Sequence, residues 1–515
     1  MAQESARPDL LSTPDPVPPL PPLLPSAARP GPRPALLTAC YGTFLVLIAY
    51  TLPTTTLAPT ASALHAGPAA QTWILTGALL GLTALLLIMG GVADDHGRKR
   101  VFTAGALLLA ASAALSALAP DTTVFVIARV LQGGASAALL APSLGLVSQA
   151  YPAGPARVRA LGGWGAAVGL GIAVGPVYAA LLAELAGWRA VYAVLAALAL
   201  LLAGLAARHL TESRSDRPRR LDPLGALTLS VGTAALIAGL AEGRTGWLRP
   251  APVTLLALGV LALGAFALVE SRVAEPMLDL ALFRDARFVA AGTGALFTGL
   301  SIVGLMSCLP SVLERALGES PLVAGLVLAI WSGLSVVAAL QSRRLADRLA
   351  PVTQLAAALL ACAVGEAALY GLTPAAGWPR LVPGLVVAGL GSGVLNAALA
   401  RLAVSSVPGH RAAMGSGANN TARYLGSALG VALSLALIGS ARSPAGPAAA
   451  AAAGADRAIV VAVALCLLGA AVALWARAAA RAAARSGACS AARAAARSRA
   501  CSGACSGARE GAQRR

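Results

Sequence analysis

The sequence predicts an all-α polytopic membrane protein with about fourteen transmembrane helices. Its composition is 57% hydrophobic and 12% charged, whereas soluble domains carry about 25% charged residues. Apolar runs of about 20 residues, the length that a helix needs to cross a ~30 Å hydrocarbon core, recur along the chain. Basic residues are concentrated in alternate connections between these runs. Together these observations exclude a soluble globular fold.

The individual spans follow from apolar windows of about 19 residues. In chain order they lie near 36–58, 72–92, 101–119, 123–149, 160–183, 189–208, 222–243, 251–270, 288–309, 321–341, 352–372, 380–403, 413–440 and 457–476. The connections between them are too short to hold a soluble catalytic domain.

The charge pattern predicts the topology. If residue 1 is cytoplasmic, the inner loops hold most of the basic residues, namely Arg98, Lys99, Arg100, Arg157, Arg159, Arg214, Arg217, Arg219, Arg220, Arg272, Arg284, Arg287, Arg343, Arg344, Arg348 and Arg411. The outer loops hold only Arg189, Arg244, Arg249, Arg315, Arg380 and Arg442. Because positive loops stay inside, we expect a multi-pass protein of the bacterial inner membrane with both termini cytoplasmic.

An internal repeat predicts how the spans are grouped. The sequence RRLADRLA at 343–350 echoes the loop at 90–100, and Asp347 follows Asp94 by 253 residues. A second echo places Arg411 252 residues after Arg159. Both offsets fit two six-helix halves, 36–208 and 288–476, separated by an extra central pair at 222–270. Cytoplasmic linkers at 209–221 and 271–287 would join these parts, the first of them basic.

The two ends of the chain have biased compositions. Residues 1–35 are rich in proline and carry no secretory signal, so we expect a disordered cytoplasmic leader. Residues 477–515 alternate alanine triplets with arginine and repeat SGACS. We expect a low-complexity, basic, cytoplasmic tail. A basic amphipathic helix lying on the membrane is the alternative.

Composition also limits the partners. The net charge of +18 could suggest nucleic acid, but the arginines lie between spans and in the tail, where they orient a membrane protein. We therefore expect a lipid bilayer and no nucleic acid. No cysteine or histidine pair has metal-ligand spacing, so neither a metal nor a cofactor is expected.

The loop after the second span, GGVADDHGRKR at 90–100, connects two uncharged runs. By itself it could be a plain turn that sets topology. Its Gly90, Asp94, Gly97, Arg98 and Lys99 match the pattern G-x-L-A-D-R-x-G-R-K, which resembles the loop signature of the major facilitator superfamily. The resemblance implies a gating loop that latches two halves on the cytoplasmic side, with Asp347 and Arg348 in the repeated copy. Asp95 departs from the pattern, which usually has arginine there.

Span four carries Arg129 and Gln132 in a pattern that resembles the superfamily's R-x-x-Q-G-x-x-x-A. Arg129 lies roughly 9 Å inside the outer face at 1.5 Å per residue. A charged side chain at that depth is costly unless it snorkels, pairs or faces water. Snorkelling is the structural explanation. The resemblance implies an interior arginine that modulates proton coupling or contacts substrate.

Span five is rich in glycine and resembles the superfamily's antiporter signature G-x-x-x-G-P-x-x-G-G. Gly171, Gly175 and Pro176 match it, and alanines replace the final glycines. A close-packing face with a proline kink is the structural alternative. With the other motifs, the span favours membership of the fourteen-helix drug:proton antiporter group.

Glu366 is the one carboxyl group that lies well inside a predicted span. Desolvation favours the protonated form of such a group, so Glu366 is a candidate proton carrier. A structural partner for an arginine is the alternative. The resembled group usually has an aspartate in span one, where this chain has Ala49 and Tyr50.

Polar and aromatic residues inside the spans are candidates for the substrate cavity. Span thirteen, MGSGANNTARYLGSALG, resembles the corresponding helix of the antiporter group. The candidates are Tyr50, Gln132, Tyr178, Trp331, Asn396, Asn419, Asn420 and Arg423.

The resemblance implies a secondary active transporter that exports small amphipathic or cationic compounds, such as drugs or antibiotics, by proton antiport and alternating access. A uniporter or importer of a metabolite would share this fold, and the missing acid in span one favours it slightly. A membrane sensor would be expected to add a folded soluble domain. No histidine lies within a predicted span, so there is no sign of a catalytic residue or of a membrane enzyme. We expect a monomer.

Overall fold

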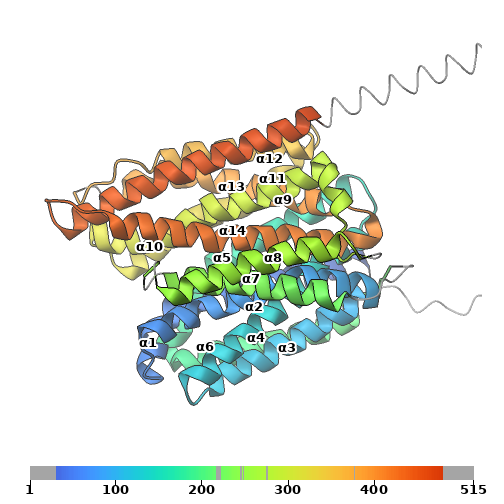
Figure 1. The fold of residues 1–515 in the computed structure, drawn as a ribbon, viewed down its shortest axis with the longest axis horizontal. Helices are drawn as coiled ribbons and strands as arrows, with labels where there is room; N and C mark the ends of the chain where they lie inside the picture. The colour runs from blue at the N-terminus through green and yellow to red at the C-terminus, as the bar shows by residue number, and fades with distance from the viewer. Residues whose placement is uncertain are drawn as a thin grey trace, which may run out of the picture.

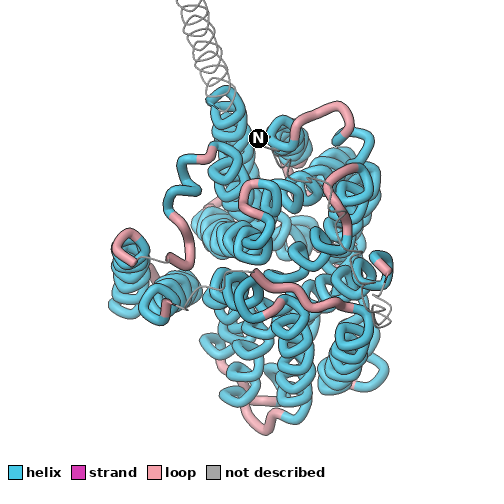
Figure 2. Tube along the Cα trace, turned by 90° about the vertical axis from the view of Figure 1, so that its right-hand side faces the viewer, coloured by secondary structure: helices cyan, strands magenta, loops and turns pink. Residues whose placement is uncertain are grey.

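The computed structural model describes residues 31–215, 222–243, 246–247, 249–273, 276–375 and 377–479. Within these residues the only regular elements are helices (Figure 2). Nearly all of the predicted leader, residues 216–221 of the first linker and the tail from residue 480 lie outside the described residues. So do Arg217, Arg219, Arg220 and Arg244 of the charge pattern.

Helices follow one another along the described chain with short connections (Figure 1). The first six are α1 (Pro32–Ala63), α2 (Pro68–His96), α3 (Arg98–Leu118), α4 (Thr122–Ala150), α5 (Pro155–Ala186) and α6 (Trp188–His209). The next two are α7 (Pro223–Gly243) and α8 (Pro250–Glu270). The remainder are α9 (Ala286–Phe297), η2 (Thr298–Val303), α10 (Gly304–Leu317), α11 (Pro321–Ala346), α12 (Pro351–Ala367), α13 (Val382–Ser405), α14 (Ala412–Ser440) and a last helix, Pro447–Ala479. Short 3₁₀ turns are η1 (Leu280–Arg284), η3 (Trp378–Leu381) and η4 (Gly409–Arg411).

The helix lengths confirm the predicted fold class. In the described residues, 13 helices are long and apolar enough to cross a membrane, and α9, η2 and α10 join into one of them, Ala286–Leu317. The remaining predicted span, 352–372, is shorter than expected because α12 ends at Ala367. The backbone N–H groups of Gly371 and Leu372 instead donate to Asp456 Oδ1 on the last helix, at 2.8 and 3.2 Å. That carboxylate stabilises the turn that ends α12.

The buried apolar side chains form two main cores. One is built almost entirely from α1–α6, and the other from α9 through the last helix. Figure 1 shows these two groups, the first coloured blue to cyan and the second yellow to red, with α7 and α8 beside them. The first core also includes residues of α13 and α14, so the two groups pack against each other through these helices and α2, α4, α5 and α11.

The pair α7–α8 packs on the first group near the boundary with the second. Trp73 Nε1 on α2 donates to Glu242 Oε1 on α7 at 3.1 Å, and Ser230 Oγ on α7 donates to the Ala84 carbonyl on α2 at 3.3 Å. Helix α7 also contacts α14. Helix α8 mainly contacts α7, and it exposes Val260, Leu261 and Leu268, which suits a lipid-facing helix.

The π-helical segment η2 interrupts the long helix Ala286–Leu317 where it meets α14. A side chain at Gly299 would overlap the Arg423 carbonyl, and one at Gly304 would lie 2.6 Å from the Gly430 backbone. The small residues therefore permit close contact. Such local π turns are often found at functional sites.

Candidate functional site

The loop between α2 and α3 joins the two groups of helices at one end of the bundle. We call this end the basic face, defined by residues 94–100 and 406–414. Asp94 is fully buried there. Its carboxylate accepts hydrogen bonds from the backbone N–H groups of Ala413 at 3.2 Å and Met414 at 2.8 Å. These N–H groups begin α14 and have no partner within the helix, so a carboxylate is the favoured partner. Asp94 thus caps a helix of the other group.

Arg98 ties the same contact together. Its Nε and Nη2 donate to Asp94 Oδ1 at 2.9 and 2.7 Å, and Nη2 also donates to the carbonyls of Gly409 and His410. The sharp turn before it is possible because Gly97 has a φ of +119°. Lys99, in contrast, donates from Nζ to the Ala207 carbonyl at 2.7 Å and stays within its own group.

Asp95 makes a second bridge between the groups. Arg411 Nη1 lies 3.0 Å from Asp95 Oδ1, and only 7% of each side chain is exposed. The acid that departs from the family pattern is therefore matched by an arginine directly before α14. A buried pair of this kind is stabilised only while both partners are present.

Glycines allow the backbones of α2 and α14 to approach closely behind these bridges. A side chain at Gly90 would lie 2.6 Å from the Ala413 carbonyl oxygen, and one at Gly417 would lie 2.6 Å from the Leu86 carbonyl oxygen. Gly91 faces elsewhere, and the nearest atom to a side chain there would be Met277 Cγ at 3.7 Å.

The repeated loop does not form an equivalent latch. Asp347 and Arg348 are both exposed at the end of α11. Within the described residues neither side chain has a hydrogen bond or ion pair, and Asp347 lies within electrostatic range of Arg401. The two loops therefore share a sequence pattern but not the same contacts. Among the described residues, the loop after α2 reaches the N-terminus of a helix in the other group, and the loop after α11 does not.

A small, partly enclosed cavity lies between the two groups, beyond the contacts of Asp94 and Asp95. Its walls come from α1, α5, η2, α11, α13 and α14. They consist of Leu47, Tyr50, Val168, Ile172, Thr298, Ile302, Val303, Trp331, Ser392, Leu395, Asn396, Arg423, Tyr424 and Ser427. Its free volume is about 50 Å³, whereas drug-sized ligands need roughly 300–1,000 Å³. The groups must separate before such a ligand can enter.

Arg423 is the charged residue of the cavity wall. Its Nη2 donates to Asn420 Oδ1 at 2.7 Å, and its Nη1 lies 3.4 Å from Asn396 Oδ1. The guanidinium also stacks over the ring of Tyr424, 5.0 Å from the centroid. Three neutral groups thus hold the guanidinium in place without neutralising it.

Aromatic rings form the rest of the polar wall. The rings of Tyr50 on α1 and Tyr424 on α14 lie 6.1 Å apart across the boundary between the groups. Trp331 Nε1 donates to Ser392 Oγ at 3.1 Å, which fixes the indole on the α11–α13 side. The cavity therefore offers flat apolar surfaces around one cation.

The structure brings only some of the predicted cavity residues to this wall. Tyr50, Trp331, Asn396 and Arg423 line it, whereas the other candidates face their own helix neighbours. Gln132 Nε2 donates to Ser116 Oγ at 3.0 Å inside the first group, and Tyr178 donates to the Val191 carbonyl at 2.8 Å. Asn419 donates to the Ala291 carbonyl on α9, and Asn420 lies behind Arg423. These four residues therefore do not line this cavity in the described conformation, and their contact with substrate stays a prediction.

Arg129 is completely buried inside the first group. Its Nη1 donates to the Ala49 carbonyl at 2.9 Å and to Gln132 Oε1 at 2.6 Å. It therefore does not snorkel to the membrane surface. The carbonyl of Ala49 partners the arginine in the part of α1 where the antiporter group was expected to have an acid.

Glu366 lies in the last turn of α12 and is also completely buried. Cys466 on the last helix donates its thiol to Glu366 Oε2 at 3.5 Å, and Ser301 on η2 lies 3.1 Å from the same sulfur. Oε1 has no hydrogen-bond partner in the described residues. Glu366 is not an ion-pair partner of any arginine that the structure describes, and it stands behind the cavity wall.

The glycines of span five serve two different contacts. A side chain at Gly171 would lie 2.6 Å from Leu47 Cβ, and one at Gly175 would overlap Thr51, so both face α1 within the first group. Gly165 and Gly169 instead face α13 and α11 of the other group. Pro176 lies inside α5.

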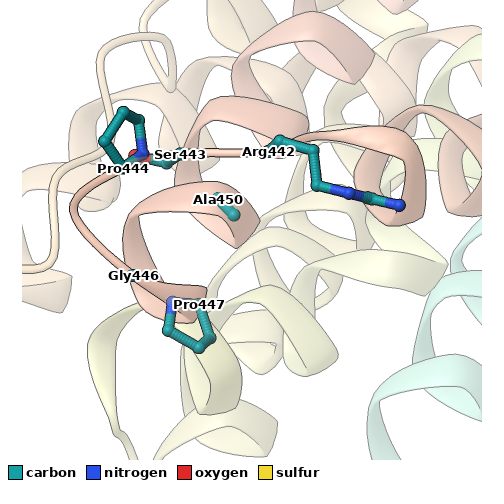
Figure 3. A pocket seen from close by; sticks show the side chains of 6 residues that line it. All are labelled: Arg442, Ser443, Pro444, Gly446, Pro447 and Ala450. Carbon is teal, nitrogen blue, oxygen red and sulfur yellow. The ribbon is translucent and has the colours of Figure 1, made fainter.

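The sequence did not indicate several of the wall residues. Thr298, Ser392, Tyr424 and Ser427 are single polar residues in apolar helices, and nothing in their spacing separates them from ordinary helix–helix contacts. Tyr424 follows Arg423 directly, which was the one available signal. A second hollow borders the turn between α14 and the last helix (Figure 3), and small or proline side chains form most of its lining. It contains none of the predicted residues.

Comparisons with known proteins agree with this geometry. The model of the Major Facilitator Superfamily matches residues 39–431. The puromycin resistance protein pur8 of Streptomyces alboniger is 35% identical over 421 residues, which cover 79% of this chain and 83% of that protein. The tetracenomycin C resistance and export protein of Streptomyces glaucescens is 30% identical over 419 residues, or 81% and 77% of the two chains.

A solved structure has the same fold. The human organic anion transporter MFSD10 (TETRAN) superposes with a TM-score of 0.62 at 19% identity. The superposition covers 86% of this chain and all of that one.

Proposed function

The chain belongs to the major facilitator superfamily of membrane transporters, and from this premise we propose that it exports small amphipathic compounds across a bacterial cell membrane by alternating access. The proposal is supported above all by the latch. Asp94 and Asp95 of one group hold the start of α14 in the other, beside an occluded cavity. Opening the latch and widening the cavity would expose it to the basic face.

The direction of export follows from orientation. We propose that the basic face is cytoplasmic, because the inner loops predicted from the charge pattern, to which residues 94–100 and 406–414 belong, hold most of the loop arginines. We propose that both termini lie on that side. Relatives named for resistance and export support efflux as the physiological direction. We propose a monomer, since one chain supplies both walls of the cavity.

We further propose that export is driven by protons and that Glu366 carries them. The membrane interior disfavours a charged carboxylate, and the described partner of Glu366 is a thiol rather than a cation. The contacts Glu366–Cys466–Ser301 lead to η2, whose Thr298 and Ile302 line the cavity. Arg129 would influence proton coupling through its contact with Ala49, which precedes the cavity residue Tyr50 in the chain.

A proton-independent uniporter or importer is the second candidate. The observation that favours it is the Arg129–Ala49 contact. In that contact a backbone carbonyl, which cannot be protonated at neutral pH, faces the arginine.

The test uses inverted membrane vesicles that are energised to an acidic interior. Lipophilic test compounds are added, and the loss of the proton gradient is followed for the native protein, Glu366→Gln and the control Glu314→Gln. Glu314 is exposed near the other end of the bundle. Substrate-dependent proton loss in the native protein and the control, but not in Glu366→Gln, is the expected result.

The other results have defined meanings. Equal proton loss in all three proteins would support antiport and contradict the role of Glu366. Entry of a compound into the vesicles only down its own gradient, without any proton loss, would favour the uniporter.

A further inference from the structure

The cavity between the two groups of helices is electropositive. Arg423 is the only charged residue among the described residues that line it. A guanidinium within the membrane is costly unless it faces water or an anion. Arg423 is only 8% exposed and, within the described chain, makes no ion pair. Its partners Asn420, Asn396 and Tyr424 supply oxygen acceptors that orient the cation but leave its charge in place.

A second cation, Arg129, is buried inside the first group and does not line the cavity, but it acts on the wall residue Tyr50. Tyr50 lies within electrostatic range of both Arg423 and Arg129. Arg129 also has neutral partners, the Ala49 carbonyl and Gln132, and its Nε and Nη2 have no hydrogen-bond partner in the described residues. Glu366 does not offset these charges at short range, because its described contact is with Cys466 on the last helix.

The shape of the wall defines the rest of the ligand. The rings of Tyr50 and Tyr424 lie 6.1 Å apart and are tilted by 60° to each other, and Trp331 is fixed by Ser392. Leu47, Val168 and Ile172 complete the side formed by the first group. Flat apolar surfaces of this kind favour a planar aromatic ligand. A carboxylate, sulfonate or phenolate on that ligand would be the missing partner of the guanidinium.

We infer that the transported compounds are planar aromatic anions, whose acidic group pairs with Arg423. This inference rests on the proposed export function and narrows its substrate class. The family resemblance implies amphipathic or cationic compounds, and of these the cationic ones fit this wall worst. A cation would meet like charge in a medium of low dielectric constant, where repulsion is strong.

The test compares two dyes with the same tricyclic xanthene ring system. At neutral pH fluorescein is an anion and rhodamine 123 is a cation. Equilibrium binding of each to the purified full-length protein in detergent is measured by fluorescence polarisation, and accumulation of each is measured in inverted vesicles. The native protein is expected to bind fluorescein at least about tenfold more tightly than rhodamine 123, which corresponds to about 1.4 kcal/mol.

Variants separate charge from structure. Arg423→Gln should lower fluorescein affinity at least about tenfold without weakening rhodamine 123, whereas Arg423→Lys should retain most of the anion preference. Arg442→Gln, an exposed change in the turn after α14, is the matched control and should leave both affinities unchanged. The native dye comparison needs no variant and stands even if Arg423→Gln fails to fold.

The possible failures are distinguishable. Tighter binding of rhodamine 123 by the native protein, or equal loss of both dyes in Arg423→Gln, would overturn the inference. Accumulation of rhodamine 123 but not fluorescein would support export and overturn the anion preference. Selective binding of fluorescein without accumulation of either dye would support the anion preference and contradict the export function.

Discussion

Arg411 Nη1 lies 3.0 Å from Asp95 Oδ1, and this buried ion pair joins two helices that are more than 300 residues apart in the chain. The family pattern has an arginine at the place of Asp95, so the charge at this position has the opposite sign in this chain. The neighbouring Asp94 caps α14 without Asp95. Two adjacent carboxylates at the end of α2 thus make separate contacts with the other group of helices.

Asp95→Asn or Arg411→Gln should each destabilise the closed protein, because the remaining charge stays buried without its partner. Loss of one partner of a buried pair costs roughly 3–5 kcal/mol. The reversed pair, Asp95→Arg with Arg411→Asp, should recover part of this. Thermal unfolding of the native protein, the two single variants and the double variant Asp95→Asn with Arg411→Gln gives the coupling. Additive single effects, with no recovery in the reversed pair, would show that the two side chains act independently.

Asp94→Asn should slow transport by more than about tenfold. It removes the charge that accepts two backbone N–H groups and Arg98, and hydrogen bonds to a charged group contribute about 1.5–3 kcal/mol each. The matched control is Asp347→Asn in the repeated loop, where the side chain is exposed. Initial rates of transport in vesicles check this. Similar losses in both variants would contradict a latch that is formed by the Asp94 loop and not by the Asp347 loop.

Gly90→Ala should hold α2 and α14 apart. A methyl group there would lie 2.6 Å from the Ala413 carbonyl oxygen, so closure at the basic face would require the backbones to shift. Gly91→Ala is the neighbouring control, because its closest contact is an ordinary 3.7 Å. We expect slow transport and easier proteolysis within 406–411 for Gly90→Ala alone. Native transport by this variant would mean that the close approach is not required.

Gly171→Ala should lower the unfolding temperature by loosening α1 from α5. The added methyl would meet Leu47 Cβ at 2.6 Å, and such overpacking typically costs 1–3 kcal/mol. Gly163→Ala is the control on the same helix, since no atom lies within 4 Å of the new methyl. Thermal unfolding in detergent distinguishes them. Equal stability of the two variants would argue against a packing role for the antiporter signature.

The sequence by itself determined the membrane class and the approximate positions of most of the helices, and it pointed to the loop at 90–100. These follow from local properties: an apolar run long enough to span is visible in any window, and the match at Gly90, Asp94, Gly97 and Arg98 needs no knowledge of neighbouring helices. The same local signals identified Arg129 and Glu366 as unusual, because a charge inside an apolar run is conspicuous wherever it points.

Only the tertiary structure decided which polar residues share a site. These helices are apolar on nearly every face, so periodicity does not fix their rotation. Gln132 and Arg423 are both polar residues inside apolar runs. Gln132 nevertheless donates a hydrogen bond to Ser116 inside one group, whereas Arg423 lines the cavity. Asp94 and Asp347 repeat the same pattern, yet only Asp94 reaches the start of a helix. Such differences depend on how whole helices pack, because the residue that each polar side chain contacts can come from a distant part of the chain.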